Sequence, residues 1–426
     1  MGDAMPRINS ARLRARLERM SEFGRPPGGT FEDGVTRVGY SEADRAARAW
    51  LSGVMKAAGL DVRIDAAANL IGRKEGRDAA AAPILFGSHS DSVIAGGNFD
   101  GPLGVLAAVE AAETLVEQGV ATTHPLEVVV WTNEEGVAYG DGLCGSRAVA
   151  GDMTAPELEK VWNGVRKADA ILGLGGDPDR LAEARRAPGS IHAYVELHIE
   201  QGSGLERAGV PIGVVQGIVA IHRYRCVVRG VANHAGTTPM ADRRDALLAA
   251  SKLVEAVREV VTGLPGRHVG TVGQLDVEPN APNVIPGTVR LTVELRDLAA
   301  GVLRELARQV KARAAVIAAA MGTTIEMEPS SFHHATLASP DVQAAIAGVA
   351  ERLGLTHLPM PSGAGHDAQI VAKLGPMGMI FVPSVGGISH SPREWTSWED
   401  CARGADVLLA TVLAVDELQS VAASGI

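Results

Sequence analysis

Two apolar runs in this chain each end in a cluster of polar residues. PILFGSHSDS (83–92) and LEVVVWTNEEG (126–136) each have the length of one buried strand, and GPLGVLAAVEAAETLVEQG (101–119) between them is helical in character, with a proline in its first turn. Continuous apolar strands that alternate with helices predict a largely parallel sheet covered on both faces. Because such sheets bind ligands beyond the carboxyl ends of their strands, both polar clusters fall where a site is expected.

The remaining pattern predicts two domains. Helices are expected at 8–20 and, capped by Ser41, up to Gly59. From about Pro211 the order becomes strands, a helix from Asp242 to Val261, two strands and a helix at 302–322, which is typical of a small α+β domain with an antiparallel sheet. After about Pro329 the helix and strand alternation resumes. We therefore expect a discontinuous catalytic domain, 1–212 and 329–426, interrupted by an inserted domain, 213–328.

Charge and composition exclude several classes of function. The net charge of -10 and the absence of a long basic run argue against nucleic acid and anionic membranes as partners. The arginine-rich start lacks the apolar segment of a secretory signal, and no apolar run reaches the roughly 20 residues of a membrane span. Three widely spaced cysteines form no disulfide or thiolate-zinc pattern. We expect a cytoplasmic protein.

Histidine, aspartate and glutamate are concentrated in five short segments. Zinc and related ions bind histidine nitrogen and carboxylate oxygen, and two ions held about 3.5–4 Å apart need a shared carboxylate with further ligands on either side. One such segment alone is more often structural, but several at strand ends favour a two-metal site. The segments are SHSD (88–91), GGNFDG (96–101), TNEEG (132–136), ELHIEQG (196–202) and ISHSPREW (388–395).

These segments resemble the amidase, hydantoinase and carbamoylase branch of the dinuclear zinc aminopeptidase-like metallohydrolases. The resemblance spans essentially the whole chain and also includes VANHAGTTPM, NVIPGTVRLTVELRD and PSGAGHDA. It implies an α/β fold: an aminopeptidase-like catalytic domain with a mostly parallel central sheet, plus an inserted α+β, ferredoxin-like domain for lid closure and dimerisation. Cys144 departs from the aromatic residue usual before GSRA, which we expect to alter packing only.

The resemblance also assigns roles around the metals. It implies two divalent ions, zinc first, with manganese, cobalt or nickel as alternatives. One ion would be held by His89 and His198, the other by Glu135 and His390, with Asp100 as the bridge.

Two further residues would serve the chemistry at this centre. Asp91 would orient the His89 imidazole. Glu134 would be the general base, taking a proton from the attacking water and delivering it to the leaving nitrogen.

A second set of residues would bind the substrate. The resemblance implies that His234 and Asn283 stabilise the oxyanion and that Arg296 clamps a substrate carboxylate, for which its planar fork is suited. Gln201 would lie near the metals and bind the ureido group, and the glycine-containing loop at 363–365, which ends at Gly365, is expected to line the substrate by close backbone approach. In the family, some of these groups come from the partner subunit, which implies a homodimer through the inserted domain.

The predicted function is hydrolysis of the ureido C–N bond of an N-carbamoyl-L-amino acid, with release of ammonia and carbon dioxide. Allantoate and β-ureidopropionate share the ureido group and carboxylate and stay open as substrates. A metallo-exopeptidase or acyl-amino acid deacylase is disfavoured by His198 and Arg296. A binding protein without catalysis is disfavoured by the intact ligands and Glu134. His366 is either an orienting residue or an ordinary loop histidine.

Overall fold

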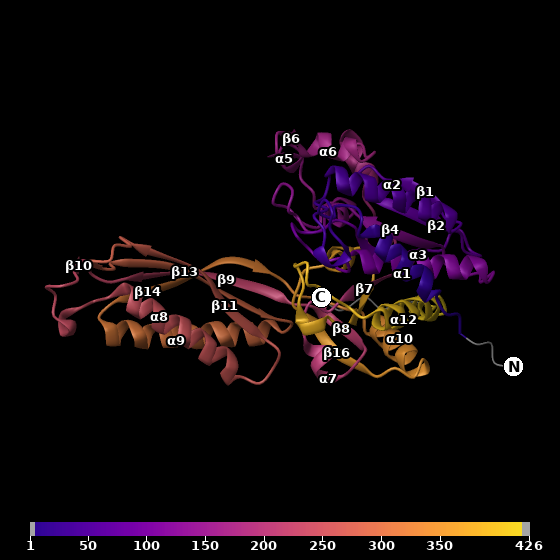
Figure 1. Ribbon diagram of the computed structural model, residues 1–426. Coiled ribbons are helices and arrows are strands. Elements are labelled where there is room, and N and C mark those ends of the chain that lie inside the picture. The colour runs from indigo at the N-terminus through magenta and orange to yellow at the C-terminus, as the bar shows by residue number, and fades with distance from the viewer. Residues whose placement is uncertain (1–4, 420–426) are drawn as a thin grey trace. The chain divides into compact units, whose positions relative to one another are not determined.

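The computed structural model describes residues 5–419, which fall into two compact units (Figure 1). The first unit comprises Met1–Gln216 and Leu337–Ile426, and the second comprises Gly217–Thr336. None of the helices within residues 5–419 combines the length and apolar character needed to cross a membrane. The three cysteines are buried and unpaired.

The first unit is built on a mixed sheet. Its strands, in spatial order, are β1 (Asp61–Ile64), β2 (Leu70–Lys74), β4 (Leu126–Trp131), β3 (Ile84–His89), β7 (Ala193–Ile199), β17 (Met377–Val382), β8 (Ile212–Ile218) and β15 (Thr336–Leu337), and β16 (His357–Ser362) also pairs with β8. The four central strands β4, β3, β7 and β17 are parallel, whereas β1, β2 and β8 join antiparallel. The predicted parallel sheet is thus confirmed at its centre.

Five long helices share one hydrophobic core with this sheet: α1 (Ser10–Met20), α2 (Glu42–Ala57), α3 (Pro102–Glu117), α10 (Pro340–Arg352) and α12 (Trp398–Asp416). Ser41 caps α2 as predicted, because its side chain accepts a hydrogen bond from the amide of Asp44. Alternate residues of β7 face this core, so Glu196 and His198 face the other side of the sheet. There the Ala368 amide of α11 (Asp367–Val371) donates to Glu196.

Shorter elements complete the first unit. They are α4 (Cys144–Ala150), α5 (Ala155–Leu158), α6 (Lys167–Gly173), α7 (Gly204–Ala208) and the ribbon of β5 (Val161–Trp162) with β6 (Val165–Arg166).

The second unit is a four-stranded antiparallel sheet with two helices. The sheet order is β11 (Val269–Glu278), β13 (Thr288–Asp297), β9 (Ala220–Arg229) and β14 (Thr324–His333), and α8 (Ala246–Gly263) and α9 (Ala300–Met321) share its core. This β-α-β-β-α-β order confirms the predicted α+β class. The helix predicted from Asp242 starts instead at Ala246, because the Asp245 side chain caps it by accepting from two amides. A short ribbon pairs β10 (Asn233–His234) with β12 (Val284–Ile285).

Candidate metal centre

Strand ends bring the predicted ligands of the first unit together. His89 is the last residue of β3, His198 lies near the end of β7, and Glu135 follows β4. Asp100 lies just before α3, and His390 lies in the loop between β17 and α12. Because β3, β4 and β7 are parallel, their carboxyl ends meet at one edge of the sheet, as the two apolar runs predicted.

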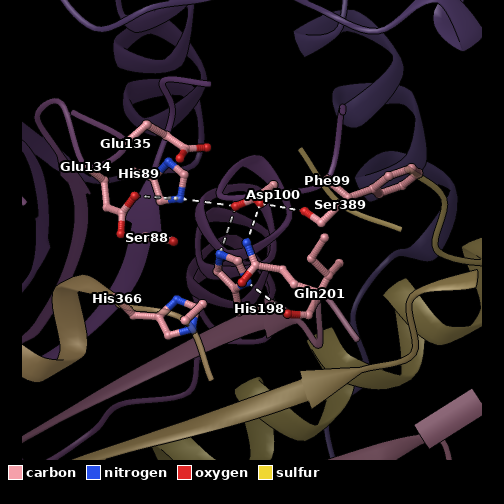
Figure 2. A network of polar contacts seen from close by, with 12 residues as sticks. Ser88, His89, Phe99, Asp100, Glu134, Glu135, His198, Gln201, His366 and Ser389 are labelled. Carbon is pink, nitrogen blue, oxygen red and sulfur yellow. Dashed lines mark hydrogen bonds and ion pairs between the residues drawn. The ribbon is translucent and has the colours of Figure 1, made fainter. Parts of the chain in front are cut away.

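Asp100 is the centre of this cluster (Figure 2). Its Oδ1 atom lies 3.5 Å from Nε2 of His89 and 3.2 Å from Nε2 of His198. Its Oδ2 atom lies 3.4 Å from Nε2 of His390, which in turn is 3.5 Å from Oε2 of Glu135. These residues form two groups of three that share Asp100, each with ligand atoms within 4.8 Å of one another. This division matches the one implied by the resemblance; metal ligation itself stays a prediction.

The tautomers of two histidines suit a cation. Nδ1 of His89 lies 3.0 Å from the carbonyl oxygen of Asp91, and Nδ1 of His198 lies 2.9 Å from that of Ile199. A carbonyl only accepts hydrogen bonds, so each Nδ1 carries a hydrogen, and Nε2 is the nitrogen that offers a lone pair when the ring is neutral. Both Nε2 atoms face the carboxylate of Asp100, and Nε2 of His198 has no hydrogen-bond partner among the described residues. Such an arrangement needs a positive charge between its members, and the donor set fits a divalent metal ion.

The pKa shifts of His89, Asp100 and His390 also indicate that the cluster favours bound positive charge. Burial disfavours the charged form of His89, but the carboxylates of Glu134 and Asp100 outweigh it and raise its pKa well above the usual value. Burial works against ionised Asp100 too, yet the facing His198 holds the pKa of Asp100 well below its usual range. The pKa of His390 is raised to about 9, first by its hydrogen bond to Asp100. A metal ion would therefore bind by displacing protons.

The side chain of Asp91 is hydrogen-bonded to the main chain at Glu134 and Glu135. The Asp91 carboxylate accepts from the amides of Glu134 at 3.1 Å and Glu135 at 3.2 Å, while His89 bonds the Asp91 carbonyl. Asp91 thus contacts both the imidazole and the Glu134–Glu135 backbone. The Glu134 carboxylate lies 3.8 Å from Nε2 of His89, and burial raises its pKa well above the usual value. A carboxylate with a raised pKa beside the cluster is suited to general base chemistry.

The cluster opens into a cavity of about 260 Å³, which is lined by residues of the first unit that include Gln201, Gly365 and His366. Nε2 of Gln201 donates to Oδ2 of Asp100 at 2.6 Å. His366 bonds Ser362 at 2.8 Å and packs edge-on against His198, with burial and then His198 lowering its pKa well below the usual value. Neutral His366 therefore supports the wall of the cavity.

The predicted oxyanion donors lie side by side in the second unit. His234 is paired with Val284 across the β10–β12 ribbon, and the neighbouring Ala235 amide donates to the carbonyl of Asn283 at 3.0 Å. Nδ1 of His234 accepts from the amides of Gly236 and Thr237, so the hydrogen of its neutral ring is on Nε2. Exposed His234 therefore presents an N–H donor, as an oxyanion contact requires.

Arg296 occupies a different part of the second unit. It lies at the far end of β13, where it pairs with Ile221 of β9. Its guanidinium binds Glu294 at 2.7 Å, and Glu294 also binds Arg223.

Two residues beside the centre, half-buried Ser389 and buried Glu394, were not predicted from the sequence. Ser389 donates to Asp100 at 2.9 Å, and Glu394 accepts from the Asp100 amide at 3.0 Å. Both stand in the segment ISHSPREW that carries His390. The signal was a glutamate four residues after a candidate ligand, but its burial was not evident from the sequence.

A buried histidine and carboxylate cluster at the carboxyl ends of parallel strands, open to a small cavity, is typical of metal-dependent hydrolases. Comparison with known proteins identifies the family. The family model for peptidase family M20/M25/M40 matches residues 85–414. The chain belongs to this family, and it is a hydrolase.

Individual relatives belong to the hydantoinase and carbamoylase type. The chain is 45% identical to N-carbamoyl-L-amino acid amidohydrolase from Geobacillus stearothermophilus, over 95% of this chain and 98% of that protein. It is 36% identical to allantoate amidohydrolase from Escherichia coli K12, over 91% and 94%. A crystal structure of a hydantoinase/carbamoylase family amidase from Burkholderia ambifaria matches with a TM-score of 0.89 and 36% identity, covering 98% of this chain and all of that one. These comparisons confirm the resemblance to the amidase, hydantoinase and carbamoylase branch.

Proposed function

We propose that this hydrolase cleaves the ureido C–N bond of an N-carbamoyl-L-amino acid, releasing ammonia, carbon dioxide and the amino acid. The observation that carries the proposal is that His198 and Gln201 both contact the carboxylate of Asp100. The segment ELHIEQG, which supplies both residues, resembles the ureido-cleaving branch. The relative at 45% identity acts on this substrate class by its name. Allantoate is the second candidate, favoured by the relative at 36% identity.

The centre would hold two divalent ions, one with His89 and His198, the other with Glu135 and His390, and Asp100 between them. When bound, such ions lower the pKa of water and polarise a carbonyl oxygen.

The protein supplies proton transfer and positioning. Glu134 accepts the proton of the attacking water and then delivers it to the leaving nitrogen. The Asp91 carboxylate accepts a hydrogen bond from the amide of Glu134 and so holds the Glu134 backbone in place. His234 and Asn283 donate hydrogen bonds to the developing oxyanion, and Arg296 binds the substrate carboxylate. One ureido C–N bond breaks, and the carbamate left behind loses carbon dioxide.

The geometry of the second unit supports a site shared between two copies of the chain. Arg296 lies near one end of β13, whereas Asn283 lies in the loop that precedes the other end at Thr288. At roughly 3.3 Å per residue, about 26 Å of strand separates Thr288 from Arg296. Figure 1 shows β10, which carries His234, at one end of this sheet. The carboxylate and ureido group of a small substrate are only a few bonds apart, which favours a site that takes these contacts from two copies over one that takes all three from a single copy. We propose that His234 and Asn283 come from a second copy.

Mixed dimers test this arrangement. Glu134→Gln and His234→Ala each inactivate a homodimer, the latter by about 10²- to 10³-fold through loss of an oxyanion donor. A purified heterodimer of the two variants should regain about half of the wild-type activity, because one of its two sites has both groups intact. The measurement is ammonia release from co-produced chains with different affinity tags. A heterodimer as inactive as its parents would place His234 in its own subunit's site.

Arg296→Ala should raise KM for ureido acids roughly 10- to 100-fold, since hydrogen bonds to charged groups contribute about 1.5–3 kcal/mol. Steady-state kinetics measure the change. Arg290→Ala, an exposed arginine on the same strand that pairs with Glu278, is the matched control and should keep the wild-type KM. A urea without a carboxylate should be an equally poor substrate for wild type and Arg296→Ala. Discrimination between the two enzymes with that urea would argue against the carboxylate role.

The substrate class itself is tested by ammonia release from a panel, with protein reconstituted with zinc or manganese. The panel contains N-carbamoyl-L-amino acids, N-carbamoyl-β-alanine, allantoate and several dipeptides. We expect turnover of ureido acids, fastest with N-carbamoyl-L-amino acids. Cleavage of dipeptides without any ureido turnover would overturn the proposed function in favour of an exopeptidase.

A further inference from the structure

Glu394 connects two segments that carry predicted metal ligands. Its Oε1 atom accepts from the amide of Phe99 at 2.9 Å and from the amide of Asp100 at 3.0 Å. Its Oε2 atom accepts from the hydroxyl of Ser389 at 2.8 Å, next to His390. Glu394 is only 3% exposed, so its carboxylate is shielded from water. A buried carboxylate that accepts from two amides, and from a hydroxyl when that hydroxyl turns toward it, fixes its partners strongly.

Glu394 and Ser389 contact Asp100 at two points, its amide and its carboxylate. The Ser389 hydroxyl also reaches Oδ2 of Asp100 at 2.9 Å, as Figure 2 shows. A hydroxyl has a single hydrogen, which it donates to one carboxylate at a time. Glu394 therefore holds the backbone of Asp100 through its amide, while the Ser389 hydroxyl lies between the carboxylates of Glu394 and Asp100 and donates to one of them at a time.

Neighbouring aromatic side chains reinforce this connection. Phe99, next to Asp100, and Trp395, next to Glu394, pack edge to face with ring centroids 5.5 Å apart. Trp398 packs against both rings, at 5.5 Å from each. The aromatic contacts and the Glu394 hydrogen bonds thus join the same two segments.

Gly97 leaves the space that Glu394 needs. A Cβ atom on Gly97 would lie 2.1 Å from Oε1 of Glu394, which is far inside van der Waals contact. The chain therefore accommodates the carboxylate at this point by having no side chain opposite it.

From this geometry we infer that Glu394 is a positioning residue for the cluster of Asp100, Glu135 and His390. It acts through the Asp100 backbone and through Ser389, and it holds Asp100 and the His390 loop in one arrangement before a metal ion binds. The inference rests on the proposed two-metal site. Outer hydrogen-bond partners of metal ligands typically change metal affinity by about 10- to 100-fold.

Calorimetric titration of metal-free protein with zinc or manganese tests this role. Glu394→Ala should weaken the binding of one of the two ions by about 10- to 100-fold, while Glu394→Gln, whose amide oxygen can accept from both amides, should stay within a few-fold of wild type. The unfolding midpoint of the metal-free protein separates a positioning role from a loss of stability. Exposed Glu399, which pairs with Arg403 on α12, provides the control Glu399→Ala, with unchanged binding.

Two results would overturn the inference. One is wild-type affinity for both ions in folded Glu394→Ala. The other, decisive where Glu394→Ala does not fold, is wild-type affinity in folded Gly97→Ala, whose methyl group must displace the Glu394 carboxylate. If wild-type protein binds two ions and both variants do so equally well, only the role of Glu394 fails. If wild-type protein with two ions releases no ammonia from ureido acids, the proposed function fails instead.

Discussion

Glu134→Gln should lower kcat by about 10²- to 10⁴-fold while leaving two metal ions bound, because the amide fills the same space but accepts no proton. Glu134 is not a member of either three-residue ligand group, and its carboxylate lies at the edge of the cluster, 3.8 Å from Nε2 of His89. Ammonia release and elemental analysis of the same preparation measure both effects.

The adjacent residue provides the matched control for this prediction. Glu135 belongs to the group with Asp100 and His390, and one of its buried oxygens has no hydrogen-bond partner in the described part of the chain. Glu135→Gln should therefore lose affinity for one ion, which Glu134→Gln should not. Near-normal turnover in Glu134→Gln would contradict its role as the base, and loss of metal from that variant would make it a ligand instead.

Asp100→Asn should remove both metal ions and reduce turnover by at least about 10³-fold. The two ions together contribute several kcal/mol to stabilising the charge of the transition state. Asp100 is the residue common to both ligand groups, and it faces three imidazoles. An asparagine cannot supply the negative charge that balances two cations.

His390→Ala is the appropriate comparison for Asp100→Asn. His390 belongs to one group only and its side chain is 52% exposed, so its loss should leave the ion held with His89 and His198. Elemental analysis then distinguishes one ion per chain from none. Full occupancy in Asp100→Asn would show that the carboxylate does not bridge.

Much of the first unit was predictable from local pattern. Apolar runs that end in polar clusters indicated β3 and β4, and their parallel pairing brings His89 to Glu134 and Glu135. The strand β8, which joins the sheet antiparallel to β17, has no such local signature, because pairing direction depends on the path of the whole chain.

The supporting contacts of the centre were less predictable. Glu394 and the Asp100 amide are 294 residues apart in the chain, so only the assembled fold shows that they meet. The start of α8 was misplaced for a different reason: Asp242 and Asp245 are equally plausible caps, and tertiary structure selects Asp245. Local pattern thus predicts which residues carry chemistry better than it predicts what holds them in place.

The aromatic cluster beside the centre gives the protein an optical reporter of its own. Two of the five tryptophans, Trp395 and Trp398, pack on Phe99, the residue before Asp100. Binding of cations at Asp100 changes the electric field across these indole rings at short range. Their fluorescence should therefore follow metal loading in real time, without any label or change to the chain.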